Sequence, residues 1–231
     1  MRDQMAAAHS AGAQLLVLPE LALSGYLAPQ EIVPLAVAPG DEEFAELVQT
    51  ARRLRLAIAF GFAERGGDGN LFNSMAYIDA HGELVSIYRK VHLWDTERRW
   101  AKPGAGFETF DIGQARAGML ICYDTRFPEA ARSLAIQGAT LALIATAWLG
   151  PADEWQLAVR ARAMDNGMYV AASALQGSHS PFAFHGGSLI VDPHGHVLAE
   201  GKEGEGHVIT ATYDEEVLQR YRARLPLLQH R

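Results

Sequence analysis

The sequence predicts one α/β domain in which short buried strands alternate with amphipathic helices. Continuous apolar runs such as residues 15–18 and 141–145 are typical of strands that are covered on both faces. Helical stretches with apolar residues on one side separate them, and hairpin signals indicate a mixed sheet or two packed sheets. With 231 residues and no repeat, low-complexity segment or linker, we expect a single domain over residues 1–231.

In the N-terminal half the clearest helix is the one whose apolar residues Phe44, Leu47, Val48, Ala51 and Leu54 share one face. A turn at residues 66–69 and a hairpin signal at residues 80–83 separate the strands that follow it. In chain order, this half is predicted to contain a helix over 2–11, a strand over 14–19, a loop rich in Gly and Pro, a helix over 41–54, and strands over 56–64, 73–79 and 84–89.

In the C-terminal half, Gly138 and Gly167 end the two main helices, and Pro193-His194-Gly195 marks a hairpin. In chain order, this half is predicted to contain strands over 107–112 and 116–121, a helix over 129–137, a strand over 141–145, a helix over 154–166, strands over 168–174, 188–191, 197–200 and 208–212, and a tail that is helical from 214.

Composition and charge exclude several classes of function. The formal net charge of −7 and the lack of a basic run argue against a nucleic-acid partner. No apolar stretch reaches the ~20 residues of a membrane span, so we expect no membrane partner. The single cysteine cannot form an intrachain disulfide, which predicts a reducing, cytoplasmic location. Histidines are not clustered at metal-ligand spacing, and we expect neither a metal nor a cofactor.

The single cysteine, Cys122, lies where a predicted strand ends and a turn leads to a helix that begins near Pro128. A lone cysteine is by default a small core residue, but here the positive end of a helix dipole is expected to favour a thiolate. Glu20 and Lys90 also follow predicted strands. Because ligands bind at strand ends in open α/β sheets, a carboxylate, an ammonium and a thiol are expected to meet in one cleft.

Several segments that contain these residues resemble the nitrilase superfamily of carbon–nitrogen hydrolases. The segments, in the order in which that family has them, are Leu18-Pro19-Glu20-Leu21 with Gly25-Tyr26, Tyr88-Arg89-Lys90-Val91-His92-Leu93, Glu97 ahead of Pro103-Gly104, Ile121-Cys122-Tyr123-Asp124, 160–166 and 185–195. The resemblance spans nearly the whole chain and implies an α-β-β-α sandwich.

The resemblance implies a role for each of the four matched residues. Cys122 would attack an amide carbon and form a thioester, and Glu20 would be the general base. Lys90, together with the backbone N–H of Tyr123, would hold the oxyanion, and Glu97 would orient Lys90 or the substrate. Lys90 is also expected to favour the thiolate of Cys122.

For three of the named residues the interpretation is divided. Glu97 could instead pair with Arg98 or Arg99. Arg126 could bind a substrate carboxylate, as the matching arginine of carbamoylases does, or pair with Glu129 or Asp124. Trp148 could line the substrate pocket or pack in the core, and the ring of Tyr123 is expected to pack beside the site.

Tyr123-Asp124 after the cysteine resembles the amidase-like members rather than nitrilases, which commonly carry Trp-Glu there. We therefore expect an amidase that converts a small carboxamide to its acid and ammonia. The alternatives are an N-carbamoyl amino acid hydrolase and a non-catalytic scaffold of the same fold. Family members pair through the helices matched by 129–137 and 154–166, which implies a homodimer or a larger homo-oligomer.

The resemblance also implies a strand ahead of the first helix. In this sequence Met1 already lies at that helix, so we expect the first strand to be missing and the chain to be N-terminally truncated relative to the family. A missing strand would leave apolar surface and unpaired backbone groups in the sandwich. Adding such a segment is expected to raise both the melting temperature and the activity.

Overall fold

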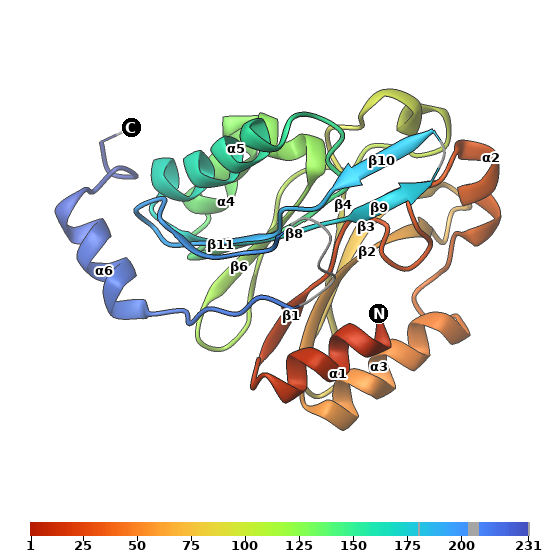
Figure 1. Cartoon of the computed structure of the whole chain (residues 1–231), viewed down its shortest axis with the longest axis horizontal. Coiled ribbons are helices and arrows are strands. Elements are labelled where there is room, and N and C mark those ends of the chain that lie inside the picture. Colours follow the sequence, from red (N-terminus) through yellow and green to blue (C-terminus); the bar gives the residue numbers. More distant parts are fainter. Residues whose placement is uncertain (180, 203–207, 231) are drawn as a thin grey trace.

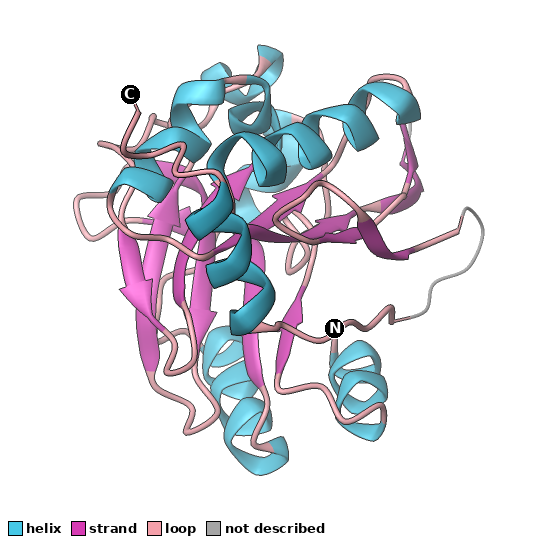
Figure 2. Cartoon of the chain, turned by 90° about the vertical axis from the view of Figure 1, so that its left-hand side faces the viewer, coloured by secondary structure: helices cyan, strands magenta, loops and turns pink. Residues whose placement is uncertain are grey.

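Two β-sheets packed face to face, with helices on both outer faces, make up most of the computed structural model (Figures 1 and 2). The structure describes residues 1–179, 181–202 and 208–230. Three clusters of buried side chains separate the four layers: one beneath each helical layer and one between the sheets. The α-β-β-α sandwich expected from the sequence is confirmed.

The first sheet has the strand order β1-β2-β3-β4. β1 is parallel to β2, and the other pairs are antiparallel. Helices α1 and α3 cover its outer face, where Met5 and Phe44 pack against Phe60. The elements of this half are α1 (Arg2–Ser10), β1 (Leu15–Val17), α3 (Glu42–Leu54), β2 (Ala57–Arg65), β3 (Leu71–Ile78) and β4 (Leu84–Arg89).

The second sheet has the order β12-β11-β8-β7-β6-β5, with β6, β7 and β8 parallel. Helices α4 and α5 cover its outer face, where Leu134 and Val159 are fully buried. Its elements are β5 (Thr109–Asp111), β6 (Arg116–Ile121), α4 (Pro128–Ile136), β7 (Leu141–Thr146), α5 (Ala152–Asn166), β8 (Tyr169–Ala174), β11 (Leu189–Val191) and β12 (Val197–Glu200).

Side chains that alternate along β2 explain why the strand is apolar throughout. Ile58 and Phe60 point outward to the α1 and α3 layer, while Ala57 and Ala59 face the second sheet. Across the interface Met119 and Ile121 of β6 fill the space between the sheets. Because both faces of β2 are covered, its residues do not alternate between apolar and polar. A continuous apolar run of this kind is the pattern from which the sequence predicts the strand.

Several smaller elements complete the fold. The helical tail predicted from 214 is confirmed as α6, whereas the short helices and the β9–β10 hairpin were not predicted from the sequence. These elements are α2 (Pro29–Ile32), the 3-10 helices η1 (Val33–Leu35), η2 (Asp95–Arg99) and η3 (Cys122–Arg126), β9 (Gln176–His179), β10 (Phe182–His185) and α6 (Glu215–Arg224).

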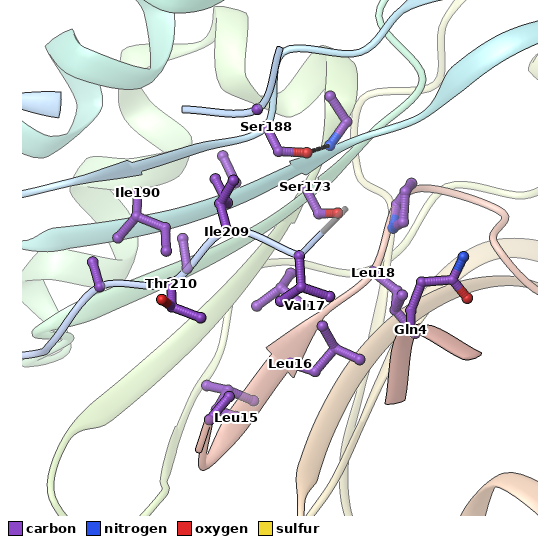
Figure 3. Close-up of a pocket in the computed structure, with 18 of the residues that line it drawn as sticks. Gln4, Leu15, Leu16, Val17, Leu18, Ser173, Ser188, Ile190, Ile209 and Thr210 are labelled. Carbon is purple, nitrogen blue, oxygen red and sulfur yellow. Dashed lines mark hydrogen bonds between the residues drawn. The ribbon is translucent and has the colours of Figure 1, made fainter. Parts of the chain in front are cut away.

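The strand predicted over residues 208–212 is wrong. Among the described residues that stretch has no strand pairing, and it lines a groove of about 800 Å³ together with β1, whose outer edge pairs with no described strand. Figure 3 shows Val17 on one side of the groove and Ile190, Ile209 and Thr210 around it. A strand needs a hydrogen-bonding neighbour, and the groove separates this segment from the free edge of β1. The expectation of a strand ahead of the first helix stays a prediction.

None of the helices in the described ranges has the length and the apolar character needed to cross a bilayer.

Candidate active site

Glu20 lies on a turn that crosses the middle of β2. Leu18 still donates a backbone hydrogen bond to Ala59, at 2.8 Å, and the chain then bends over Gly61. A Cβ atom on Gly61 would lie 2.4 Å from the backbone nitrogen of Leu21 and 2.7 Å from Cα of Glu20. A glycine is therefore required for the turn to approach the strand so closely. The turn places the Glu20 side chain out of contact with solvent.

Lys90 follows β4 directly and is fully buried. Its backbone N–H donates to the Asn73 carbonyl at 2.8 Å, and its carbonyl accepts from Gly104 at 2.9 Å. The Nζ atom donates to Oε1 of Glu20 and to Oε1 of Glu97, each at 2.7 Å. A buried ammonium requires such partners, because an uncompensated charge in the interior is costly. The prediction that Glu20 and Lys90 meet is confirmed by these contacts.

Glu97 contacts Lys90 and has no ion pair with Arg98 or Arg99 among the described residues. Its Oε2 atom accepts from the backbone N–H of Trp94 at 2.9 Å, within η2. This removes the alternative, left open by the sequence, in which Glu97 pairs with the neighbouring arginines.

Further residues that the sequence did not single out hold these two carboxylates. Asn73 of β3 donates through Nδ2 to Oε1 of Glu20 at 2.8 Å and to Oε1 of Glu97 at 3.3 Å. Tyr26 donates its hydroxyl to Glu97 at 3.3 Å, and the backbone N–H of Ala147 donates to Glu20 at 2.8 Å. Tyr26 lies in a matched motif, but nothing in the sequence marks Asn73, because any buried strand can carry an asparagine.

Cys122 is the first residue after β6 and is partly exposed. Its φ of 45° is in the left-handed region, which is uncommon for a residue other than glycine. A strained turn of this kind, held in place by its surroundings, is a recurrent feature of active sites. The backbone at Cys122 redirects the chain from β6 into η3 and then α4, in agreement with the predicted change from strand to turn to helix.

The surroundings of Cys122 favour its thiol form, chiefly through the loss of solvation. Burial raises the pKa of Cys122 well above its ordinary value, and the Glu20 carboxylate adds to this, while Lys90 acts in the opposite direction. The expectation that the position favours a thiolate is therefore wrong. Lys90 acts in the predicted direction, but the loss of solvation and the nearby carboxylate outweigh it.

The pKa values of Lys90 and Glu97 are also shifted. Burial by itself would lower the pKa of Lys90, but the charges of Glu20 and Glu97 raise it above its ordinary value. Burial, together with Glu20, raises the pKa of Glu97 to about 7, although Lys90 opposes the shift. Two buried carboxylates around one ammonium thus resist carrying two negative charges.

The three residues expected around the substrate have different surroundings. The Arg126 guanidinium pairs with Glu154 and lies 4.7 Å from the ring centre of Trp148. Trp148 packs against Trp155 and is 7% exposed, which favours the core interpretation. The alternative in which Arg126 pairs with Glu129 or Asp124 does not hold, because its partner, Glu154, comes from the facing helix α5. The ring of Tyr123 packs edge-on against Phe127 at 5.1 Å.

Within the described ranges, no group of three His, Cys, Asp or Glu side chains is arranged to hold a metal ion.

Comparison with known proteins matches residues 2–223 to the carbon-nitrogen hydrolase family. The chain belongs to the carbon-nitrogen hydrolase family. Within the family it is 36% identical to a probable nitrilase of Schizosaccharomyces pombe, over 87% of this chain and 75% of that protein. It is 35% identical to a 2-oxoglutaramate amidase of Bacillus subtilis, over 93% of this chain and 83% of that protein.

A solved structure from the same superfamily is also similar. The amidase of Nesterenkonia AN1 superposes with a TM-score of 0.85 at 32% identity, over 97% of this chain and 87% of that chain. One structure of that amidase contains acrylamide, and another has an acetamide group bound covalently to the active site cysteine. This carbon-nitrogen hydrolase is accordingly an enzyme of the amidase and nitrilase type.

Proposed function

We propose that the chain hydrolyses a small carboxamide to the carboxylic acid and ammonia through a thioester on Cys122. The single observation that carries this proposal is the buried arrangement in which Lys90 binds Glu20 and Glu97, each at 2.7 Å, while their charges act on Cys122. A cation that can hold an oxyanion, a base and a nucleophile are the groups that acyl transfer requires.

The first step is the formation of the thioester. Because Cys122 rests as a thiol, a base must accept its proton as sulfur attacks, and Glu20 takes this role. The Sγ–C bond forms, and the carbonyl electron pair moves to oxygen, where Lys90 and the backbone N–H of Tyr123 hold it. The oxygen lone pair then re-forms the carbonyl, the C–N bond breaks, and the proton on Glu20 leaves with the nitrogen as ammonia.

The second step returns the enzyme to its starting state. Glu20 accepts a proton from water, whose oxygen attacks the thioester carbon. The C–Sγ bond then breaks, sulfur regains the proton from Glu20, and the carboxylic acid leaves. One carboxylate thus serves as base and acid in both halves of the reaction.

The proposal is tested by an ammonia-release screen over short amides, ω-amides and N-carbamoyl amino acids. Cys122→Ala is expected to abolish release while circular dichroism shows an unchanged fold. Lys90→Met is expected to lower kcat by about 10²–10³, as for the loss of an oxyanion donor. The exposed Lys102→Met is the matched control and should retain activity. Turnover in Cys122→Ala would contradict the proposal.

A covalent probe tests the nucleophile separately from turnover. Fluoroacetamide modifies the active site cysteine of a variant of the Nesterenkonia amidase. We expect it to add an acetamide group to this chain, seen as a mass increase of the intact protein. Since the chain has one cysteine, the variant Cys122→Ala should show no increase. Equal labelling of the wild type and of Cys122→Ala would show that fluoroacetamide reacts with a residue other than Cys122, and would contradict its role as the nucleophile.

The ion pair of Arg126 with Glu154 favours an uncharged carboxamide as the substrate over an N-carbamoyl amino acid. Recognition of a substrate carboxylate would require Arg126 to leave Glu154. Release of CO2 together with ammonia in the screen would instead identify a carbamoylase.

We further propose that the active form is a homodimer joined through α4 and α5. These helices pack together and expose large apolar side chains: Leu157 is 69% exposed, Met164 48% and Ile136 44%. Apolar side chains concentrated on one face of a soluble protein are typical of an interface. The cytoplasmic location expected from the single cysteine remains part of the proposal.

A further inference from the structure

Asp124, two residues after Cys122, is fully buried and accepts hydrogen bonds from both sides of the site. We propose that Asp124 is a positioning residue that fixes Lys90 relative to Cys122, an inference that rests on the proposed function. It is two residues from the nucleophile in sequence, and its side chain binds the strand end that carries the ammonium.

On the Lys90 side, Asp124 accepts hydrogen bonds from Tyr88 and His92, which lie two residues before and two residues after Lys90 in the chain. The Tyr88 hydroxyl donates to Oδ2 at 2.7 Å, and the His92 backbone N–H donates to Oδ1 at 3.0 Å. The Nδ1 atom of His92 lies 2.8 Å from the same Oδ1 and donates to it when protonated. Asp124 thus holds the chain both before and after Lys90.

On the Cys122 side, Asp124 closes the turn that carries the nucleophile. Its Oδ2 atom accepts from the backbone N–H of Ile121 at 3.0 Å, so the side chain reaches back over Cys122. Its own carbonyl accepts from Phe127 at 3.0 Å, and the Phe127 ring stacks on the His92 ring at 3.7 Å. The left-handed φ of Cys122 is held between these contacts.

Only an acceptor with two oxygens satisfies this arrangement. An asparagine has the same size, but its amide group offers two N–H donors on one side. Whichever way it turns, those donors face a backbone N–H, either that of Ile121 or that of His92. One of the two backbone groups would lose its partner, and the turn or the strand end would move. Because Asp124 is placed to contact Lys90's neighbours rather than substrate, kcat should change more than KM.

The test compares Asp124→Asn with a matched substitution remote from the site. Asp192 is 8% exposed and, like Asp124, accepts from backbone N–H groups and contacts a histidine Nδ1, in the turn between β11 and β12. Asp192→Asn therefore reports the structural cost of losing such an acceptor. Both variants should melt at a lower temperature than the wild type.

Two readouts separate a positioning role from a structural one, both measured below the melting transitions. For Asp124→Asn we expect kcat for ammonia release to fall about 10- to 100-fold, with KM within about threefold of the wild type. The rate at which iodoacetamide alkylates Cys122, followed by intact mass, should fall as well. Asp192→Asn should leave both rates at the wild-type value. Unchanged rates in Asp124→Asn, or equal losses in Asp192→Asn, would overturn the proposal.

The alkylation readout does not depend on the substrate. If the wild type released no ammonia from any amide, the proposed function would fail, and the alkylation rates would still decide the role of Asp124. Should Asp124→Asn not fold, Tyr88→Phe removes one donor and keeps the ring. A slower alkylation of Cys122 in folded Tyr88→Phe is then the expected result, and an unchanged rate would contradict the proposal.

Discussion

Lys90 is the residue around which the site is organised. It is fully buried, and two carboxylates share it through hydrogen bonds of 2.7 Å. Burial in a low dielectric strengthens these interactions and makes the loss of any one partner costly. The same environment raises the pKa of the Cys122 thiol, so the mechanism proposed above needs a base at the moment of attack rather than a stored thiolate.

The titration of Glu97 gives a prediction at this scale. Its pKa is 4.5 ordinarily and about 7 in the folded chain, so the folded state binds the proton more tightly than the unfolded state does. The contribution of this group to stability is present below pH 4.5 and is lost as the pH rises through about 7. As the pH rises over that window, the ionisation of Glu97 should lower the free energy of unfolding by on the order of 3 kcal/mol.

Glu97→Gln should abolish this loss, since a glutamine does not titrate. Urea denaturation between pH 5 and 7.5 measures the effect, with the exposed Glu108→Gln as the matched control. The control should follow the wild type. The same pH slope in Glu97→Gln as in the wild type would contradict the assignment of the shifted pKa to this carboxyl.

At the scale of elements, the site depends on how closely loops approach strands. The turn that carries Glu20 crosses β2 at Gly61, and the segment after η2 approaches the end of β4 at Gly104, where a Cβ would lie 2.1 Å from the Arg89 carbonyl oxygen. Each glycine permits an approach that a side chain would prevent. Strand ends thus carry the groups proposed for catalysis, and glycines allow them to converge.

Gly61→Ala should therefore displace the turn of Glu20 from β2. We expect both the melting temperature and kcat to fall, the latter by about 100-fold if the carboxylate moves by 1 Å. Gly67→Ala is the matched control, because a Cβ at Gly67 meets nothing within 4 Å. Wild-type kcat in Gly61→Ala would show that the turn tolerates the added methyl group.

At the scale of the whole molecule, two exposed features lie on different parts of the sandwich. The α4 and α5 layer carries the exposed apolar side chains assigned above to a dimer interface. The groove beside β1 is bordered by a free strand edge and by residues 208–213 (Figure 3). A strand edge of this kind offers unpaired backbone groups to another strand.

The dimer proposal predicts that Leu157→Glu yields a monomer, because a charge placed at an apolar interface loses its hydration without gaining a partner. Light scattering after size-exclusion chromatography measures the mass. Leu35→Glu is a matched control, since Leu35 is 47% exposed on η1, remote from the α4 and α5 face. A monomeric wild type, or a dimeric Leu157→Glu variant, would contradict the interface.

The α/β class could be predicted from the sequence, because strands buried on both faces and amphipathic helices follow directly from hydrophobic pattern, and the four-layer arrangement followed from the family resemblance. Glu20, Lys90, Glu97 and Cys122 were singled out because they follow predicted strands or lie in motifs of the family that the sequence resembles, and their catalytic roles stay a proposal. The tertiary structure alone decided what surrounds them. The partner of Arg126, the bridging amide of Asn73 and the protonation of Cys122 depend on distances between segments far apart in the chain. The local sequence pattern carries no information about such distances. Ion pairs, hydrogen bonds and pKa shifts depend on them, because burial and nearby charges act only at short range.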